Sequence, residues 1–343
     1  MTTYYVDAAT GDNDDTGRTE LLAWATIQYA VTNSSNGDHV YIKASADYTE
    51  TVACTEAASN SWRTYEGYTS TPGDGGKATI DATGETYGLS AYNGMPPPHN
   101  LYNRWENIIV ENASGAGIGF GTTVHVALIN IESNNNGGYG FSVSAPSTIV
   151  NCSASSNTGY GFAGAGALVA CSSAVGNSTT GFYYPYSMFG CESISNSTYG
   201  IQCGGGGYPA ILIGNTIDGD SKDTTTGIST PALQYFVAIN NIIYDCATGI
   251  SQGASTWRSN YVANNLLYSN TTNFTNVTDE HDNLTTDAPA FTDEAGGDYT
   301  LASGSAARNA GADASGTSSP GMDIGAHQSA DAGGGGSRVI ITG

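Results

Sequence analysis

The sequence predicts an all-β solenoid, a parallel β-helix, and three observations support this fold class. A related segment recurs eight times through the middle of the chain, at intervals of about 22 residues. Within the repeats, apolar residues alternate with other residues over short runs, which is the period of a β-strand. Glycine is abundant, at 46 of 343 residues, and suits the many tight corners that short strands need.

Each repeat carries an anchor residue that sets the expected register of the coils. We expect every anchor to face the core. The anchors are Ile108, Ile131, Cys152, Cys171, Cys191, Asn215, Asn241 and Asn265. An inward asparagine can donate its amide to the same residue one coil away, and cysteine packs in that position as a small apolar residue. Stacked coils then bury a continuous core that no single repeat could form.

The strands inside the repeats are predicted from residues at alternate positions. Two clear runs are Ile211, Ile213, Asn215 and Ile217, then Val237, Ile239, Asn241 and Ile243. This pattern predicts strands with one face in the core, and it excludes helical repeats. A coil of about 22 residues accommodates three short strands and three turns.

Four segments resemble right-handed parallel β-helix proteins of the pectate-lyase-like superfamily, including its phage and surface members. They are Y-Y-V-D-A-A-T-G-D-N-D-D-T-G at the start, W-A-T-I-Q-Y-A-V from Trp24, G-D-H-V-Y-I-K from Gly37 and M-D-I-G-A-H from Met322. The resemblance implies a right-handed, single-stranded solenoid with an N-terminal capping helix and a closing D-I-G-A motif. The apolar face of that helix would carry Ala23, Ile27, Ala30 and Val31. The superfamily holds lyases, hydrolases, epimerases, tailspikes and non-catalytic proteins, so the resemblance leaves the activity open.

Three regions are predicted along the chain. Residues 1–50 form the cap and first strands, and residues 51–328 form the parallel β-helix with its closing segment. Residues 329–343 contain four consecutive glycines, a flexible linker, followed by a short apolar strand with Val339, Ile340 and Ile341. We expect this tail to dock on another copy, as in a homotrimer, or on a capsid protein.

The charge balance narrows the partners. The chain has 9 basic and 31 acidic residues, a net charge of −22, which argues against nucleic acid and anionic membrane as partners. The opening M-T-T-Y-Y-V-D has neither the positive nor the apolar region of a signal peptide. We therefore expect synthesis in the cytoplasm without a signal peptide, reduced thiols at the six cysteines, and a final place on a virion or cell surface.

An acidic loop is the candidate metal site. Asp218, Asp220 and Asp223 could supply oxygen ligands to Ca²⁺, with Lys222 as a neighbouring base, or they could form a solvated loop. Tyrosines mark a second candidate, because Tyr139, Tyr160 and Tyr199 occupy one position of three repeats. They are expected either to contact a glycan or partner, or to form a structural ladder.

No catalytic residue is assigned from the sequence. Glycoside hydrolysis needs two carboxyl groups at a defined separation, and no pair shares a register among Glu111, Glu132, Glu192 and Asp218. The histidines show no zinc-ligand spacing; they are His39, His99, His125, His281 and His327. The basic residues Arg104, Lys222 and Arg258 are widely separated, so turnover of polyuronates is not expected.

Two functional classes follow. The favoured expectation is a non-catalytic, elongated structural protein of a virion or surface, used for decoration or for adhesion to a surface glycan. The alternative is a secreted or virion-borne polysaccharide lyase or glycoside hydrolase.

Overall fold

The computed structural model describes most of the chain. The described residues are 1–54, 61–91, 101–121, 124–144, 147–164, 167–204, 209–221, 224–230, 235–254, 260–312 and 321–329. They fall into two compact units. Unit 1 comprises residues 1–168 with 174–179, and unit 2 comprises residues 169–173 with 180–343. Each unit is described by itself.

Unit 1 contains strands of three parallel sheets, here named A, B and C. Sheet A has β1 (Thr3–Asp7), β2 (His39–Lys43), β4 (Arg63–Tyr68), β7 (Leu101–Glu106), β10 (Val124–Ile129) and β13 (Ser147–Val150). Sheet B has β5 (Ala78–Asp81), β8 (Ile108–Glu111), β11 (Glu132–Asn134) and β14 (Ser153–Ser155). Sheet C has β3 (Val52–Cys54), β6 (Leu89–Ala91), β9 (Ile118–Phe120), β12 (Phe141–Val143) and β15 (Phe162–Ala163).

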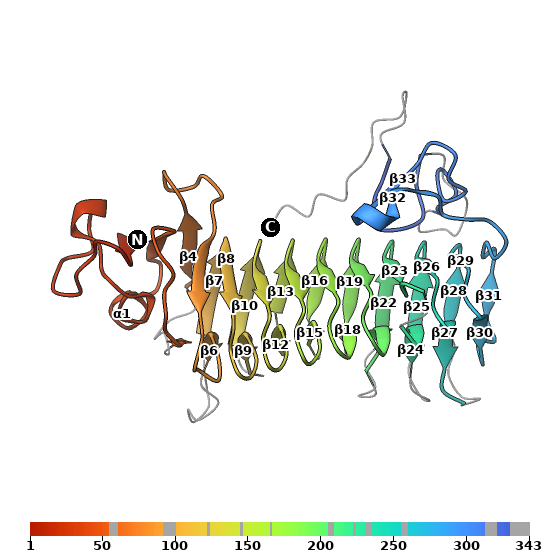
Figure 1. Cartoon of the computed structure of the whole chain (residues 1–343), viewed down its shortest axis with the longest axis horizontal. Coiled ribbons are helices and arrows are strands. Elements are labelled where there is room, and N and C mark those ends of the chain that lie inside the picture. Colours follow the sequence, from red (N-terminus) through yellow and green to blue (C-terminus); the bar gives the residue numbers. More distant parts are fainter. Residues whose placement is uncertain are drawn as a thin grey trace. The chain divides into compact units, whose positions relative to one another are not determined.

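Unit 2 continues the same pattern, and Figure 1 shows β22, β25, β28 and β31 following one another. Its strands of sheet A are β19 (Ser187–Phe189), β22 (Ala210–Ile213), β25 (Phe236–Ile239), β28 (Tyr261–Ala263) and β31 (Glu280–His281). Sheet B has β20 (Glu192–Ile194), β23 (Thr216–Asp218), β26 (Ile242–Tyr244) and β29 (Leu266–Tyr268). Sheet C has β18 (Thr180–Tyr183), β21 (Tyr199–Gln202), β24 (Thr226–Thr230), β27 (Thr248–Gln252) and β30 (Thr272–Thr275).

Along the sequence, the units meet at β16 (Leu168–Ala170) of sheet A and β17 (Ser173–Val175) of sheet B. From β4 to β30, each coil supplies one strand to each sheet, and strands of successive coils pair in parallel. The predicted all-β parallel β-helix is therefore confirmed. No helix in the described part of the chain is long and apolar enough to cross a membrane.

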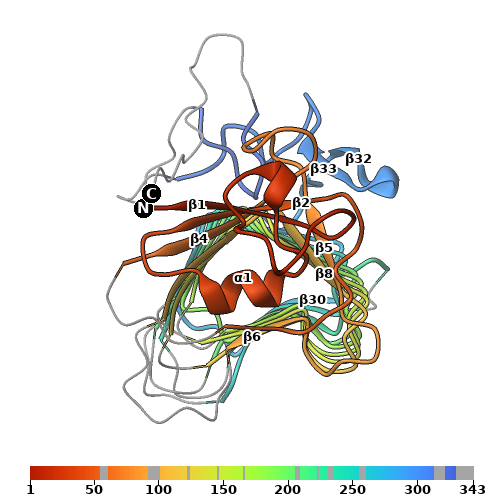
Figure 2. The same ribbon diagram turned by 90° about the vertical axis from the view of Figure 1, so that its left-hand side faces the viewer.

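The capping helix is confirmed as α1 (Ile27–Asn33), which follows the 3-10 turn η1 (Glu20–Leu22). Figure 2 shows α1 across the end of the first coils of unit 1. Ile27, Ala30 and Val31 are buried on one face of the helix, and Ala23 is buried just before it. The Glu50 carboxylate accepts hydrogen bonds from the amides of Ile27 and Gln28 at 2.8 and 2.9 Å. These contacts satisfy amides that the first helical turn leaves free.

The corner between sheets A and B explains most of the repeat, and it corrects one anchor. One residue per coil has a left-handed backbone there, with φ between 49° and 63°. These residues are Asn107, Asn130, Asn151, Cys171, Gly190, Gly214, Asn240 and Asn264. The following residue points inward, as predicted for seven of the eight anchors. The prediction for Cys171 is wrong, because Cys171 is the corner residue and is exposed, while Ser172 occupies the inward position.

At this corner in unit 2, stacked asparagines inside the core supply hydrogen-bond partners to one another. The Asn215 amide donates to the Asn241 Oδ1 atom at 2.9 Å, and Asn241 donates to Asn265 at the same distance. The ladder continues from Asn265 to Asn283 at 3.0 Å. The predicted asparagine ladder is confirmed and is one coil longer than the anchors indicated. All six cysteines are free, and five of them are buried.

The closing segment covers part of sheet B in unit 2. It contains the antiparallel pair β32 (Phe291–Asp293) and β33 (Asp298–Leu301), the 3-10 turn η2 (Glu294–Gly296), and the D-I-G-A motif. Ile324 of that motif is buried in a cluster with Ile242 and Leu266. Gly325 has φ +104, a conformation that favours glycine, and its amide donates to the Asn240 carbonyl at 2.8 Å. The motif therefore helps to close an apolar cluster between sheet B and the closing segment of this unit.

Candidate functional site

The candidate site lies on the outward face of sheet A in unit 1, where several ionisable side chains lie on neighbouring strands. Side chains alternate along a strand, so burying Val40, Tyr65 and Trp105 turns their neighbours outward. The outward residues that form the candidate site, here the sheet A site, are His39 and Tyr41 of β2, Glu66 of β4, and Arg104 and Glu106 of β7.

Two carboxylates are direct neighbours in this site. Glu66 and Glu106 are register partners on adjacent parallel strands, which are spaced about 4.8 Å apart. Their side chains are 14% and 19% exposed, so solvent and a ligand can reach both. Retaining glycosidases place their two carboxyl groups about 5–5.5 Å apart. The spacing of the strands therefore suits this chemistry.

Each carboxylate has a different basic partner. The Nε2 atom of His39 lies 2.9 Å from the Oε2 atom of Glu66. The Nε–H group of Arg104 donates to the Oε1 atom of Glu106. A guanidinium carries its charge at every pH that a protein meets, whereas an imidazole exchanges its proton near neutrality. The environments of the two carboxylates therefore differ in kind.

Both carboxylates affect the pKa of Tyr41. Burial raises the pKa of the Tyr41 phenol, and the negative charges of Glu66 and Glu106 raise it further. Tyr41 therefore stays protonated and can donate a hydrogen bond at neutral pH. The imidazole of His39 stacks on the Tyr41 ring, with 4.2 Å between the ring centroids.

Aromatic rings continue this face beside the carboxylates. Tyr102 of β7 stacks on His125 of β10, with centroids 4.5 Å apart and planes 7° from parallel. Trp62 meets Tyr102 edge to face at 5.6 Å and is 43% exposed. Exposed aromatic rings can stack on the apolar faces of sugar rings, and the polar atoms of these side chains can form hydrogen bonds with the sugar hydroxyl groups. The face therefore joins two acids, an arginine and an aromatic surface.

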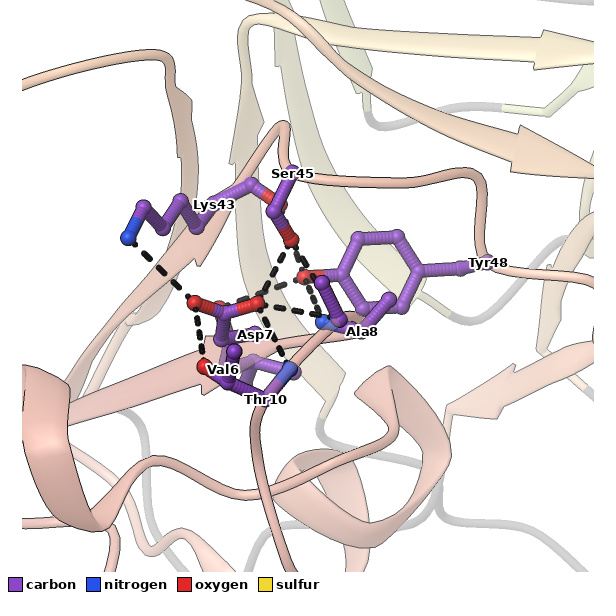
Figure 3. Close-up of polar contacts among 8 residues, drawn as sticks. Val6, Asp7, Ala8, Thr10, Lys43, Ser45 and Tyr48 are labelled. Atoms are coloured by element: carbon purple, nitrogen blue, oxygen red, sulfur yellow. Dashed lines mark hydrogen bonds and ion pairs between the residues drawn. The ribbon is translucent and has the colours of Figure 1, made fainter.

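A neighbouring polar network, drawn in Figure 3, holds the first strands together. The Asp7 carboxylate accepts from the Ser45 hydroxyl at 2.6 Å and from the Thr10 hydroxyl at 3.0 Å, and Lys43 Nζ lies 3.3 Å away. Burial acts to raise the pKa of Asp7, but these hydrogen bonds outweigh it and lower the pKa to about 2. Tyr48 donates its hydroxyl to the Lys43 carbonyl at 2.9 Å. Asp7 is 3% exposed, so this network is structural.

The predicted metal ligands are only partly described. Asp218 is buried, and the Tyr299 hydroxyl of the closing segment donates to it at 2.6 Å. Burial raises the pKa of Asp218. Asp220 lies on the adjacent turn, where its amide donates to Asp218 at 2.9 Å, whereas Lys222 and Asp223 lie outside the described residues. Within the described ranges, no three acidic, histidine or cysteine side chains are grouped to hold a metal.

The three predicted contact tyrosines are divided between the units. Tyr139 and Tyr160 of unit 1 stack with centroids 4.9 Å apart and planes 13° from parallel. Tyr199 of unit 2 pairs in register with Thr180 and Thr226. The docking residues Val339, Ile340 and Ile341 lie outside the described residues.

The carboxylates selected from the sequence have separate partners. Glu132 pairs with Lys77 at 2.7 Å in unit 1, and Glu192 pairs with His327 at 2.5 Å in unit 2. Glu111 is the register partner of Asp81 on sheet B. A hydrogen bond from Asn112 lowers the pKa of Asp81, whereas burial and nearby carboxylates raise the pKa of Glu111.

The pair of Glu66 and Glu106 was not predicted from the sequence. Forty positions separate these residues, which is nearly two repeat lengths, and they lie in the less regular coils before the clear repeats. The repeat period therefore does not align them. A signal was present in the motif R-T-Y-E at Arg63 and N-R-W-E at Asn103, where an aromatic core residue precedes each glutamate.

Comparison with known proteins supports the fold. The chain matches no protein-family model and no curated protein. It is similar to the crystal structure of the pectate lyase Pel9A, with a TM-score of 0.58, 15% identity and 96% of each chain covered. It is also similar to a GH136 lacto-N-biosidase from Eubacterium ramulus, with a TM-score of 0.50 and 12% identity over 83% of this chain and 68% of that one. At these identities the likeness shows the fold alone, which is a right-handed parallel β-helix of the pectate-lyase-like kind.

Proposed function

We propose that this protein is a glycoside hydrolase that binds a glycan across the sheet A site and cleaves it with Glu66 and Glu106. The observation that carries the proposal is the pairing of these two glutamates in register on adjacent strands. The fold is compatible with this class, because the similar structures include a lacto-N-biosidase. The site therefore favours a catalytic role over the purely structural one expected from the sequence.

The two basic partners assign the roles. Glu106, held by the permanent charge of Arg104, is the nucleophile, because a carboxylate must be ionised to attack carbon. Glu66, held by the His39 imidazole, is the acid and base, because it lacks the permanent cationic partner that keeps Glu106 ionised. Tyr41 lies beside Glu66 and donates a hydrogen bond to the bound sugar.

The reaction proceeds in two balanced steps. The Glu66 carboxyl donates its proton to the glycosidic oxygen as the bond to the anomeric carbon breaks. A Glu106 carboxylate oxygen forms an ester with that carbon. Water then attacks the anomeric carbon and releases Glu106, while Glu66 accepts the proton of the water. Two inversions at one carbon give a product with retained configuration.

The charge of the protein selects the substrate class. A net charge of −22 and two carboxylates at the site repel polyuronates and sulfated glycans. Arg104 is already paired with Glu106, so its positive charge is offset at the site. The expected substrate is therefore a neutral glycan. As in the sequence-based prediction, we expect no turnover of polyuronates.

The test screens neutral polysaccharides for the release of reducing ends and follows the anomeric configuration of the product by NMR. We expect release from at least one neutral glycan, with retention of configuration. Glu66→Gln and Glu106→Gln should each slow release by about 10²- to 10⁴-fold while glycan binding persists. Glycan binding without release by the parent would favour non-catalytic adhesion at the same face, and an inverted product would contradict the assigned roles.

A further inference from the structure

Part of the outward face of sheet A in unit 2 is apolar. Ile211 and Ile213 of β22 face outward, and so do their register partners Val237 and Ile239 of β25. Phe189 of β19 and Tyr261 of β28 extend the row on either side. Phe189 and the four aliphatic residues are half-buried, and Tyr261 is 36% exposed. These six residues form what we call the apolar face.

The backbone corner places these residues outside the core. The alternation in the sequence suggests one buried face that runs from Ile211 through Ile217. Gly214 instead adopts a left-handed backbone with φ +63, and this corner changes which side of the chain faces the core. Leu212 and Asn215 are buried, while Ile211 and Ile213 are not. A contiguous apolar surface of this kind on a soluble protein usually marks a place where another chain segment binds.

The described chain ends beside the apolar face. The Gly325 amide donates to the carbonyl of Asn240, the residue that follows Ile239. The carbonyl oxygen of Ala326 lies 3.8 Å from where a Cβ atom on Gly190 would stand, and Gly190 follows Phe189. The segment therefore runs along the corner that borders the apolar face, and Ser329 is its last described residue.

The sequence that follows has the composition and length to cover the face. Fourteen residues follow Ser329, and they include the Gly333–Gly336 linker and then Val339, Ile340 and Ile341. Val339 lies ten positions after Ser329, a span that reaches at most about 35 Å when extended. The face spans the four strands β19, β22, β25 and β28, about 14 Å across at the strand spacing. The tail can therefore reach every residue of the apolar face.

We propose that residues 337–343 pack on the apolar face of their own chain as an extended segment. A flexible linker gives the tail a local concentration near the millimolar range, which favours its own chain over a second copy. Alternation along an extended segment turns Val339 and Ile341 toward the face and Ile340 away from it. This proposal concerns unit 2 and does not depend on the proposed hydrolase site in unit 1.

The experiment replaces Ile341 with the photo-crosslinking residue p-benzoylphenylalanine in the full chain, at low protein concentration. We expect a product of monomer mass, with crosslinks mapped to peptides that contain β19, β22 or β25. The matched variant carries the same residue at Ile340 and should give much less of this product. A crosslinked dimer would show a second copy as the occupant. Crosslinks elsewhere, or equal yields from both positions, would also overturn the proposal.

A second measurement covers the case in which the bulky residue prevents docking. The chain cut after Ser329 should bind an apolar fluorescent dye several-fold more strongly than the full chain. In the cut chain, Ile213→Glu should reverse most of that gain because it places a charge in the exposed face. Equal dye binding by the cut and full chains would contradict the proposal.

Discussion

Replacing Asn241 with alanine should destabilise unit 2 strongly, because the side chain is the middle of the asparagine ladder. Its Oδ1 atom accepts from the amide and the side chain of Asn215 at 3.0 and 2.9 Å. Its Nδ2 atom donates to the Leu212 carbonyl at 3.0 Å and to Asn265 at 2.9 Å. The substitution removes these four hydrogen bonds from a fully buried position. At about 1 kcal/mol net for each bond, the loss is about 4 kcal/mol.

Urea unfolding followed by circular dichroism measures this loss, and native-state hydrogen exchange localises it. We expect the amide of Asn215 to lose its protection in Asn241→Ala, because its acceptor is gone. Ser251→Ala, which changes an outward residue of β27 in the same unit, should alter stability by less than about 0.5 kcal/mol. A loss below about 1 kcal/mol for Asn241→Ala, with Asn215 still protected, would refute the role assigned to the ladder.

Three further predictions concern ionisable groups. Asp7 has a folded pKa of about 2, so its network stabilises the fold above the ordinary aspartate pKa. Asp7→Asn should therefore lower the free energy of unfolding by about 2 kcal/mol at pH 7. In urea melts, this difference should vanish as the pH falls from about 4 to about 2. The hydrogen bond that His327 donates to the Glu192 carboxylate raises the pKa of His327, so this pair stabilises the fold below about pH 6.5. Thermal melts should show that this contribution is lost as the pH rises through the raised pKa and is absent in His327→Gln. Cys171 alone among the six cysteines should react with a thiol reagent in the native protein, because the other five are buried. Burial raises the pKa of Cys152, for example, to about 12. A second thiol that reacts before unfolding would contradict the burial pattern.

The fold was predictable from the sequence because the repeat encodes its corners. Asparagine or glycine at the left-handed corner is followed by an inward residue, and this order recurs at each coil from Asn107 to Asn264. Cys171 broke the pattern, since nothing in its identity distinguishes a cysteine at the corner from one in the core. The outward placement of Ile211 and Ile213 was missed for a related reason, because one left-handed residue reverses the facing of the chain.

The site was less predictable, because it is assembled across coils of unequal length. Glu66 and Glu106 become neighbours only once β4 pairs with β7, and the segment between these strands has no repeat to align. Similarly, Asp218 was a candidate metal ligand in the sequence. In the structure, its carboxylate accepts a hydrogen bond from the hydroxyl of Tyr299, which lies 81 residues further on. Such contacts depend on the packing of distant segments, which a local pattern does not specify.

The central claim is that Glu66 and Glu106 act together in hydrolysis, and a comparison of two carboxylate pairs tests it most directly. Asp81 and Glu111 are also register partners in unit 1, but on sheet B, and they serve as a matched control. Release of reducing ends from the best neutral glycan is measured for the parent and for each double variant. We expect near-complete loss for Glu66→Gln with Glu106→Gln, and near-parental release for Asp81→Asn with Glu111→Gln. Release that survives the first pair of changes, or that is lost only with the second, would contradict it.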